Sequence, residues 1–346
     1  MQPDPPIGIA VVGAGYWGPN LIRNAAASDD LVLRWVCDLD LDRAHRVVGR
    51  YSTISLTDDL FTVLDDPAVA AVAIATPAHT HADVALACLE AGKHVLVEKP
   101  LAWTVADGEK LVALAEDRDL VLMCDHTYCY TPAVQRIRQL VGEGALGDIQ
   151  YVDSVRINLG LVQPDIDVFW DLAPHDLAIL DVILPEGCAP TAVAAQGADP
   201  LGTGRACIGY LTLPLTGGGI AHAHVNWLSP TKIRTTIIGG SRRMLVWDDL
   251  NPSQRLSMYD TGVELARERL GNPEARRDSI ISYRVGDMVA PALAEREALQ
   301  SVMAELVASI RERRSPLTDG HAGLRVLKTL DAATRSIDKG GMAVPI

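Results

Sequence analysis

Residues 7–18 read I-G-I-A-V-V-G-A-G-Y-W-G. An apolar run of strand length precedes three glycines spaced G-x-G-x-x-G, at Gly13, Gly15 and Gly18. Between a strand and a helix, the first glycine permits a tight turn, the second lets the backbone approach a pyrophosphate, and the third lets the helix pack on the strand. Pro19 follows, where the missing N–H of a first helical turn is harmless. The stretch therefore predicts a dinucleotide-binding unit.

Short apolar runs continue to alternate with helical patterns as far as residue 125, which is typical of βαβ units and a parallel sheet. Six is also the number of strands that a doubly wound dinucleotide-binding domain requires. The candidate strands span residues 7–12, 31–37, 52–56, 69–75, 94–97 and 120–124. We expect an α/β Rossmann domain over residues 1–125.

The pattern changes after residue 125, where long segments alternate polar with apolar residues, as in an antiparallel sheet with one covered face. These candidate strands span residues 148–159, 206–213, 219–229, 232–239 and 242–248. Helical spacing recurs at residues 132–143, 293–313 and 319–337. We expect residues 126–346 to form an α+β domain with a large, mostly antiparallel open sheet, used for substrate binding and oligomerisation.

Length and composition limit the classes of function. The chain has 346 residues, 48% of them apolar, which is enough for two cores. A formal net charge of -13 disfavours nucleic acid as a partner, because that binding depends on clustered Lys and Arg. We see neither a signal peptide nor an apolar run of about 18 residues, so we expect a cytoplasmic protein without a membrane partner.

Asp38 directly follows the second candidate strand. A carboxylate there accepts hydrogen bonds from ribose hydroxyls and repels a 2'-phosphate, so we expect NAD rather than NADP, with Asp40 as the alternative if the register differs. We expect no metal at His79 and His81, because no Cys or acidic residue is spaced to complete a site. The remaining expected cofactor contacts lie in the glycine turn or at strand ends: Tyr16, Trp17, Thr76, Pro77, His79, Glu98 and Lys99.

Four motifs follow one another along the chain: G-x-G-x-x-G, then A-T-P-x-x-x-H at 75–81, E-K-P at 98–100 and D-x-x-x-H at 171–175. Together they resemble the Gfo/Idh/MocA oxidoreductase family, and the resemblance reaches R-S-P-L-T-D-G at 314–320. It implies a second domain whose open sheet packs against that of another subunit, as a homodimer or homotetramer. It also implies NAD(P)-dependent oxidation or reduction of a sugar or cyclitol.

In that family the lysine of E-K-P and both polar residues of D-x-x-x-H flank the reacting carbinol, which implies catalytic roles for Lys99, Asp171 and His175. Asp171 and His175 are four residues apart, so they share one face of a helix. An imidazole suits general-base chemistry near neutrality, and the ammonium of Lys99 would stabilise the reacting oxygen. Whether His175 or Lys99 is the formal base stays open. We expect Asp176, which lies off that face, to be structural.

The stretch W-D-L-A-P-H-D-L at 170–177 resembles a narrower group of sugar-nucleotide 3-dehydrogenases, deoxysugar 3-ketoreductases and enzymes of amino-sugar antibiotic pathways. We expect oxidation of a ring secondary hydroxyl, at C3, of a sugar or amino sugar. Asp165 and Asp167 favour a cationic amino sugar. A nucleotide-sugar 3-dehydrogenase or 3-ketoreductase, a cyclitol dehydrogenase, an NAD-dependent glycosidase and a non-catalytic NAD-binding regulator remain alternatives.

Overall fold

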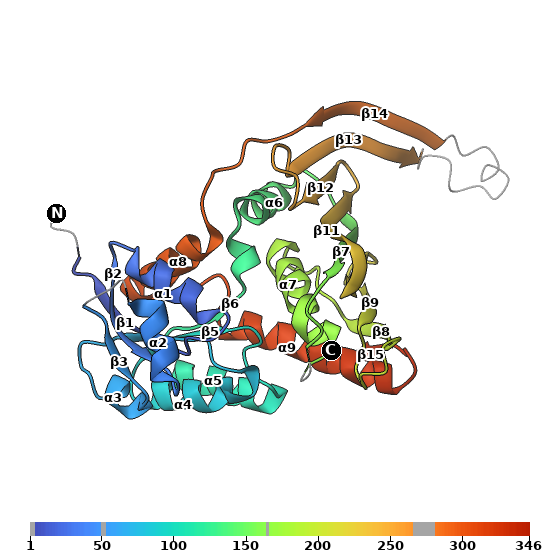
Figure 1. Ribbon diagram of the computed structural model, residues 1–346. Coiled ribbons are helices and arrows are strands. Elements are labelled where there is room, and N and C mark those ends of the chain that lie inside the picture. Colours follow the sequence, from blue (N-terminus) through green and yellow to red (C-terminus); the bar gives the residue numbers. More distant parts are fainter. Residues whose placement is uncertain (1–3, 50–52, 164–165, 266–280) are drawn as a thin grey trace. The chain divides into compact units, whose positions relative to one another are not determined.

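The computed structural model describes residues 4–49, 53–163, 166–265 and 281–346 (Figure 1). The chain divides into two compact units. The first comprises Met1–Pro132, Leu177–Val182 and Glu295–Asp331, and the second comprises Ala133–Asp176, Ile183–Ala294 and Ala332–Ile346. The domain boundary expected between residues 125 and 126 stays a prediction, because each unit combines several chain segments. Across the described ranges, no helix is both long and apolar enough to span a membrane.

The first unit contains a six-stranded parallel sheet in the order β3-β2-β1-β4-β5-β6. This is the order of a doubly wound dinucleotide-binding fold. All six predicted strands are confirmed, although β3 begins three residues late. The strands are β1 (Ile7–Val12), β2 (Leu31–Cys37), β3 (Ser55–Thr57), β4 (Ala71–Ile74), β5 (His94–Glu98) and β6 (Leu122–Asp125).

Helices cover both faces of this sheet, with α1 and α8 on one face and α4 and α5 on the other (Figure 1). Every residue of β4 is buried, as a central parallel strand requires. The helices of the unit are α1 (Gly18–Ala26), α2 (Leu41–Val48), α3 (Leu60–Leu64), α4 (His81–Glu90), α5 (Val105–Asp117) and α8 (Ala298–Glu312), with 3-10 turns η1 (Ala78–Thr80) and η2 (Thr127–Tyr130).

Residues from late in the chain complete the first unit. Thr318 pairs with the edge strand β6, where its carbonyl accepts the N–H of Cys124 at 2.8 Å and its hydroxyl donates to the carbonyl of Cys124 at 2.7 Å. Glu297, at the start of α8, accepts two hydrogen bonds from Arg23 and one from Asn24 on α1. The nucleotide-binding fold therefore includes residues that lie almost 300 positions away in sequence.

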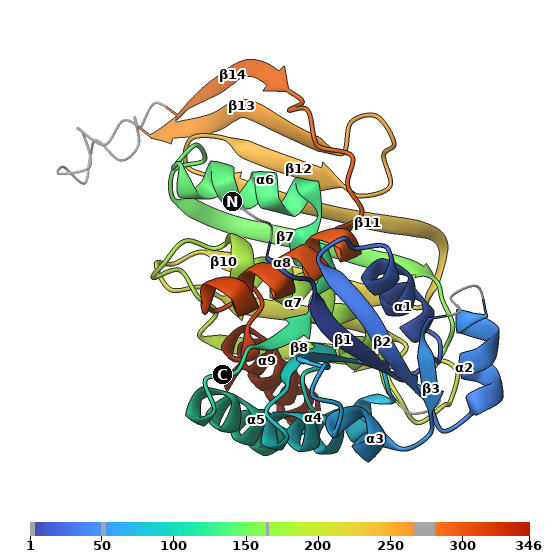
Figure 2. The same ribbon diagram turned by 90° about the vertical axis from the view of Figure 1, so that its left-hand side faces the viewer.

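The second unit contains a nine-stranded sheet in the order β14-β13-β12-β11-β7-β10-β9-β8-β15. Its pairs are antiparallel except β7 with β10, so the predicted fold class is confirmed. Figure 2 shows β12, β13 and β14 side by side at one edge. The strands are β7 (Ile149–Leu159), β8 (Ala192–Ala198), β9 (Ile208–Pro214), β10 (Ile220–Asn226), β11 (Leu228–Gly240), β12 (Met244–Asp248), β13 (Leu256–Leu265), β14 (Ile281–Val289) and β15 (Val344–Pro345).

The five predicted strands of this sheet are confirmed, but β8, β13, β14 and β15 were not predicted. The sequence of β8, A-V-A-A-Q-G-A, is rich in small residues with low strand propensity. Glycine interrupts the apolar alternation of β13 and of β14. The predicted helices also form, as α6 (Pro132–Gly142), α8 and α9 (Gly320–Asp338), and the D-x-x-x-H segment lies in α7 (Val168–Ile183).

Candidate active site

The glycine turn between β1 and α1 has the geometry that a dinucleotide site requires. Gly13 has a φ of 98°, in the left-handed region, and a Cβ on it would lie 2.6 Å from the carbonyl oxygen of Ala75. A Cβ on Gly18 would collide with the carbonyl of Gly13. A Cβ on Gly15 would meet nothing within 4 Å, so the protein leaves open the space where a pyrophosphate would approach. These residues fit a dinucleotide cofactor.

The N-terminus of α1 adds to this fit. No side chain caps the helix, although the N–H of Asn20 donates to the carbonyl of Trp17 at 2.9 Å. The positive end of the helix dipole favours an anion such as a phosphate. Trp17 occupies the N-cap position, and its indole Nε1 is buried. Tyr16 is 96% exposed. Contact of Tyr16 and Trp17 with the cofactor stays a prediction.

Asp38 lies at the end of β2, as predicted, and is 6% exposed. Its Oδ2 accepts the N–H of Ala14 at 2.6 Å, its Oδ1 accepts the N–H of Asp40 at 2.8 Å, and the guanidinium of Arg43 contacts both oxygens. Burial alone would raise the pKa of Asp38, but these hydrogen bonds outweigh it and lower the pKa. The residue is therefore an anion fixed beside the glycine turn.

Asp40, the alternative ribose ligand, caps α2 instead. Its Oδ1 accepts the backbone N–H of Arg43 at 2.9 Å. Arg43 was not predicted from the sequence as the partner of Asp38, which lies five residues earlier.

The carboxyl ends of β4 and β5 are tied together by His81. It is 1% exposed, and its ring nitrogens lie 2.8 Å from the carbonyl oxygen of Pro100 and 2.9 Å from that of Thr76. Burial lowers the pKa of His81. His81 is therefore a buried side chain that links two backbone segments. His79, in contrast, is exposed. The cofactor roles predicted for Thr76, Pro77 and His79 stay predictions.

Glu98 and Lys99 follow one another at the end of β5, as predicted. Glu98 pairs in the sheet register with Asp125 at the end of β6, and His126 comes next in the chain. Asp125 and His126 are each 1% exposed. Neither residue was predicted from the sequence, because only the pairing of β5 with β6 brings this segment beside Glu98.

Two carboxylates at the start of α7 have different roles. Asp167 caps the helix, since its Oδ1 accepts the N–H of Phe169 at 2.9 Å and of Trp170 at 3.0 Å. Asp171 is anchored elsewhere, because its Oδ2 accepts the indole N–H of Trp227 at 2.9 Å. Asp171 therefore does not cap α7 and is held by a neighbouring segment of the second unit.

Asp176 has the structural role that we expected. Its carboxylate accepts hydrogen bonds from Arg156 at 2.8 and 3.0 Å and from Ser154 at 2.8 Å, and the ionic side chains are 4–5% exposed. Asp167 is also buried enough that burial raises its pKa, with the two helix N–H groups opposing the rise. Asp165 lies outside the described residues. Asp167 therefore does not support the expectation that loop acids select a cationic sugar.

Lys99 belongs to the first unit, whereas Asp171 and His175 belong to the second. Within the second unit, α7 carries Asp171 and His175 one turn apart, with His175 half-buried. The convergence of all three side chains on one carbinol stays a prediction.

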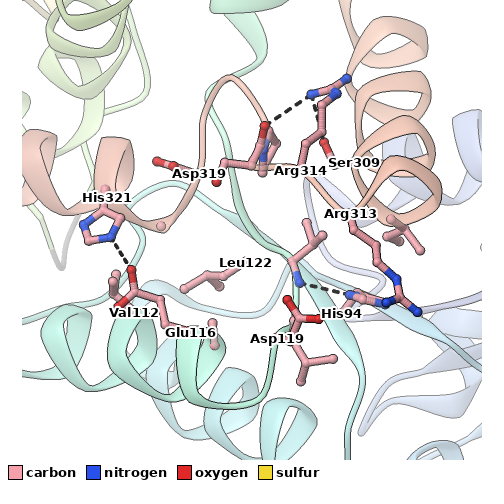
Figure 3. Close-up of a pocket in the computed structure, with 17 residues that line it drawn as sticks. His94, Val112, Glu116, Asp119, Leu122, Ser309, Arg313, Arg314, Asp319 and His321 are labelled. Atoms are coloured by element: carbon pink, nitrogen blue, oxygen red, sulfur yellow. Dashed lines mark hydrogen bonds and ion pairs between the residues drawn. The ribbon is translucent and has the colours of Figure 1, made fainter.

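A cavity of about 650 Å³ lies elsewhere in the first unit (Figure 3). His94 and Leu122 line it, and they are the first residues of β5 and β6, whereas Lys99 and Asp125 lie at the opposite strand ends. A hydrogen bond between Glu116 and His321, 2.7 Å long, borders it. Parallel sheets of this kind bind ligands at carboxyl ends, so this cavity is not the candidate active site. Over the residues described, no group of three or more His, Cys, Asp or Glu could hold a metal ion.

Comparison with known proteins gives the family. The Gfo/Idh/MocA family model, described as an oxidoreductase family with an NAD-binding Rossmann fold, matches residues 7–126. A relative from Acidithiobacillus ferrooxidans, UDP-N-acetylglucosamine 3-dehydrogenase, is 30% identical over 92% of this chain and 93% of its own length. The chain belongs to this oxidoreductase family. The resemblance drawn from the four motifs, the enzyme class and the NAD cofactor are thereby confirmed.

Solved structures agree with this assignment. A crystal form of the Acidithiobacillus ferrooxidans UDP-N-acetylglucosamine 3-dehydrogenase covers 97% of this chain and 99% of its own, with a TM-score of 0.80 and 25% identity. GenD2 from gentamicin A biosynthesis, in complex with NAD, covers 100% and 98% with a TM-score of 0.81. At 24% identity, GenD2 supports the fold alone.

Proposed function

We propose that this oxidoreductase uses NAD to oxidise a ring secondary hydroxyl, at C3, of a sugar that carries an amino or acetamido group. The observation that carries the proposal is the full-length relationship to a 3-dehydrogenase of an N-acetylamino sugar nucleotide. The preference for NAD over NADP rests on Asp38, whose fixed negative charge lies beside the glycine turn. That charge would repel a 2'-phosphate.

NAD, when bound, supplies a hydride acceptor, and the glycine turn, α1 and Asp38 are the groups that would hold it. The carbinol carbon loses a hydride while its hydroxyl loses a proton. In our proposal His175 or Lys99 takes that proton, and the ammonium of Lys99 stabilises the reacting oxygen. Asp171 orients the imidazole or a neighbouring substrate hydroxyl. Its hydrogen bond from Trp227 fixes the carboxylate for that task.

A nucleotide-linked sugar is the second candidate substrate. The relative named above acts on a UDP-sugar. Of the two acids that favoured a cationic sugar, Asp167 caps α7 and Asp165 lies outside the described residues. The two candidates differ in whether a diphosphate contributes to binding. Comparing the KM of a free amino sugar with that of its UDP or dTDP form decides between them.

The test is NADH formation, followed by absorbance, with a panel of UDP-N-acetylglucosamine, N-acetylglucosamine, glucosamine and myo-inositol. We expect NADH with an amino or acetamido sugar, loss of rate when C3 carries deuterium, and a 3-keto product in NMR spectra. Turnover of myo-inositol alone would indicate a cyclitol dehydrogenase. Release of an aglycone without NADH would indicate a glycosidase. NAD binding without turnover of any sugar would indicate a regulator.

We also propose that the protein is a homodimer or homotetramer formed through the nine-stranded sheet. One face of this sheet carries an aromatic cluster in which Tyr210 stacks on His224, with ring centroids 4.4 Å apart. Tyr210 is 44% exposed, and the neighbouring Ile220 and Ile233 are 47% and 37% exposed. Apolar and aromatic side chains exposed on one face suit a subunit contact. Light scattering should give the mass of a dimer or tetramer, and the Tyr210→Glu variant should have a lower mass. A monomeric mass for the unmodified protein contradicts the proposal.

A further inference from the structure

Two acidic side chains end neighbouring strands of the first sheet. Glu98 ends β5, Asp125 ends β6, and the register places them directly opposite each other. Oε1 of Glu98 and Oδ2 of Asp125 are buried, and neither has a hydrogen-bond partner of good geometry among the residues that the structure describes. Two ionised carboxylates so placed would repel each other without water to screen them. The arrangement is suited to a pair that holds one proton.

The surroundings of the two acids differ. Burial raises the pKa of Glu98 well above its ordinary value, and the carboxyl of Asp125 raises it further. The charge of Lys99 and its backbone N–H, which donates to Oε2 of Glu98 at 3.2 Å, oppose this rise without cancelling it. Burial also raises the pKa of Asp125, but the carboxyl of Glu98, the hydroxyl of Thr127 and the indole of Trp17 all oppose that rise. Thr127 donates to Oδ1 of Asp125 at 2.7 Å. Side-chain donors therefore favour the charged form of Asp125, whereas burial and the carboxyl of Asp125 favour the neutral form of Glu98.

Burial disfavours the charged forms of the adjacent titratable side chains. Burial, and then the charge of Lys99, lowers the pKa of His126 to about 3. Burial lowers the pKa of His81, although its hydrogen bonds with the carbonyls of Pro100 and Thr76 oppose that decrease. The charges of Lys99 and of the exposed His79 add smaller decreases. Burial raises the pKa of Cys124. The charge of Lys99 lowers the pKa of each of these buried groups. Lys99 directly follows Glu98, and its backbone N–H donates to Oε2 of Glu98 at 3.2 Å, so the acid pair adjoins the lysine in the chain.

We propose that Glu98 keeps its proton and donates it in a hydrogen bond to an ionised Asp125, and that the single negative charge of this pair holds Lys99 as an ammonium. Asp125 and Glu98 are then positioning residues, because they act through Lys99. The catalytic consequence rests on the proposed function, in which Lys99 contacts the substrate oxygen. The charge state of the pair does not depend on that function.

Infrared spectroscopy of the cofactor-free protein tests where the proton lies. At pH 7 we expect the C=O stretch of a buried carboxylic acid, which disappears in Glu98→Gln and persists in Asp125→Asn. Glutamine can donate to Asp125 as the neutral acid does, so Glu98→Gln should still fold. A band that survives in Glu98→Gln, or is lost in Asp125→Asn, overturns the assignment.

The pH dependence of amine labelling at Lys99, read by peptide mass spectrometry after acetic anhydride treatment, tests the effect on the lysine. Asp125→Asn should move the labelling midpoint to lower pH, since an opposite charge has been removed. Glu98→Gln should leave the midpoint in place, whatever it does to turnover. Equal midpoints in Asp125→Asn and the unmodified protein contradict the proposal.

The same variants show whether the effect reaches catalysis. In Asp125→Asn the limb of the kcat profile that reports Lys99 should move to lower pH with the labelling midpoint, while the KM for NAD changes less than threefold. Glu116→Gln, an exposed acid on α5, is the control and should move neither. If no sugar gives NADH, the proposed function fails, but the infrared and labelling results still decide the charge state of the pair.

Discussion

The indole N–H of Trp227 donates a hydrogen bond to Oδ2 of Asp171 at 2.9 Å, across 56 positions of sequence. Trp227 is 1% exposed and lies between β10 and β11. The contact fixes the carboxylate of the D-x-x-x-H motif from outside its own helix. Asp171 is thus oriented by the sheet of the second unit as well as by α7.

Trp227→Phe should lower kcat/KM roughly tenfold while leaving the fold intact, because a hydrogen bond to a charged group contributes about 1.5–3 kcal/mol. Steady-state kinetics checks this. Trp247→Phe is the matched control, since Trp247 is 2% exposed and its indole N–H has no partner within the described ranges. Equal losses of activity in both variants would mean that bulk, and not the hydrogen bond, is responsible.

Lys99→Ala and His175→Ala should each reduce kcat by at least about 100-fold, which is the usual contribution of a general acid or base. NADH binding, measured by fluorescence, should persist in His175→Ala. Lys110→Ala is the control, because that lysine pairs on the surface with Asp107. A near-normal rate in both His175→Ala and Lys99→Ala would rule out the proposed catalytic roles.

Asp38→Ser should raise the ratio of kcat/KM for NADP over NAD by about tenfold or more, equivalent to ~1.4 kcal/mol. The substitution removes the charge that opposes a 2'-phosphate and leaves the guanidinium of Arg43, now 2.6 Å from Oδ1, to pair with that phosphate. Asp40→Ser keeps an oxygen that can cap α2 and removes the carboxylate that lies 3.8 Å from the guanidinium of Arg43, and it should not change the ratio. If the ratio changes in Asp40→Ser and not in Asp38→Ser, Asp40 is the residue that selects NAD.

Asp176→Asn should destabilise the protein by about 3–5 kcal/mol, because it leaves the guanidinium of Arg156 buried without its anion. Urea unfolding followed by circular dichroism measures this change. Asp181→Asn breaks a comparable pair with Arg325, but that guanidinium side chain is 58% exposed, so we expect a change below about 1 kcal/mol. If Asp176→Asn costs no more than Asp181→Asn, the buried pair is not structural.

His126 should make the fold sensitive to acid. Its pKa falls from the ordinary 6.5 to about 3 in the folded protein, because burial and the charge of Lys99 oppose protonation. The unfolded chain therefore binds a proton below pH 6.5 that the folded chain does not. The contribution of His126 to the free energy of unfolding is therefore fully present above pH 6.5. It decreases by about 1.4 kcal/mol per pH unit as the pH falls towards 3.

His126→Gln removes the titrating group, so its unfolding free energy should fall less steeply than that of the unmodified protein between pH 6 and 4. Chemical unfolding at several pH values gives both slopes. Parallel slopes would show that His126 is protonated in the folded state as readily as in the unfolded chain.

The parts of this molecule that follow local rules were predictable from sequence. The glycine turn, the strands before and after it, and Asp38 at the end of β2 depend on neighbouring residues, and all are confirmed. The partner of Asp38 was not predicted, because Arg43 reaches it only after α2 has turned. Asp125 was missed for a similar reason, since only the strand order β4-β5-β6 brings it opposite Glu98.

The sheet of the second unit was harder to predict. β8 consists mainly of small residues, and its pairing with β9 depends on long-range register and not on a local pattern. The contact between Trp227 and Asp171 likewise joins segments that carry no shared sequence signal. Sequence motifs were therefore enough to propose the catalytic candidates. The residues that contact and orient them could be found only from the structure.

The pairing of Thr318 with β6 and of Glu297 with α1 has a consequence for biosynthesis. The first 126 residues leave the ribosome without the segments that cover their sheet edge and one of their helices. The dinucleotide fold can therefore reach its final form only after nearly the whole polypeptide has been translated, and a fragment truncated after residue 126 would expose apolar surface to chaperones and proteases.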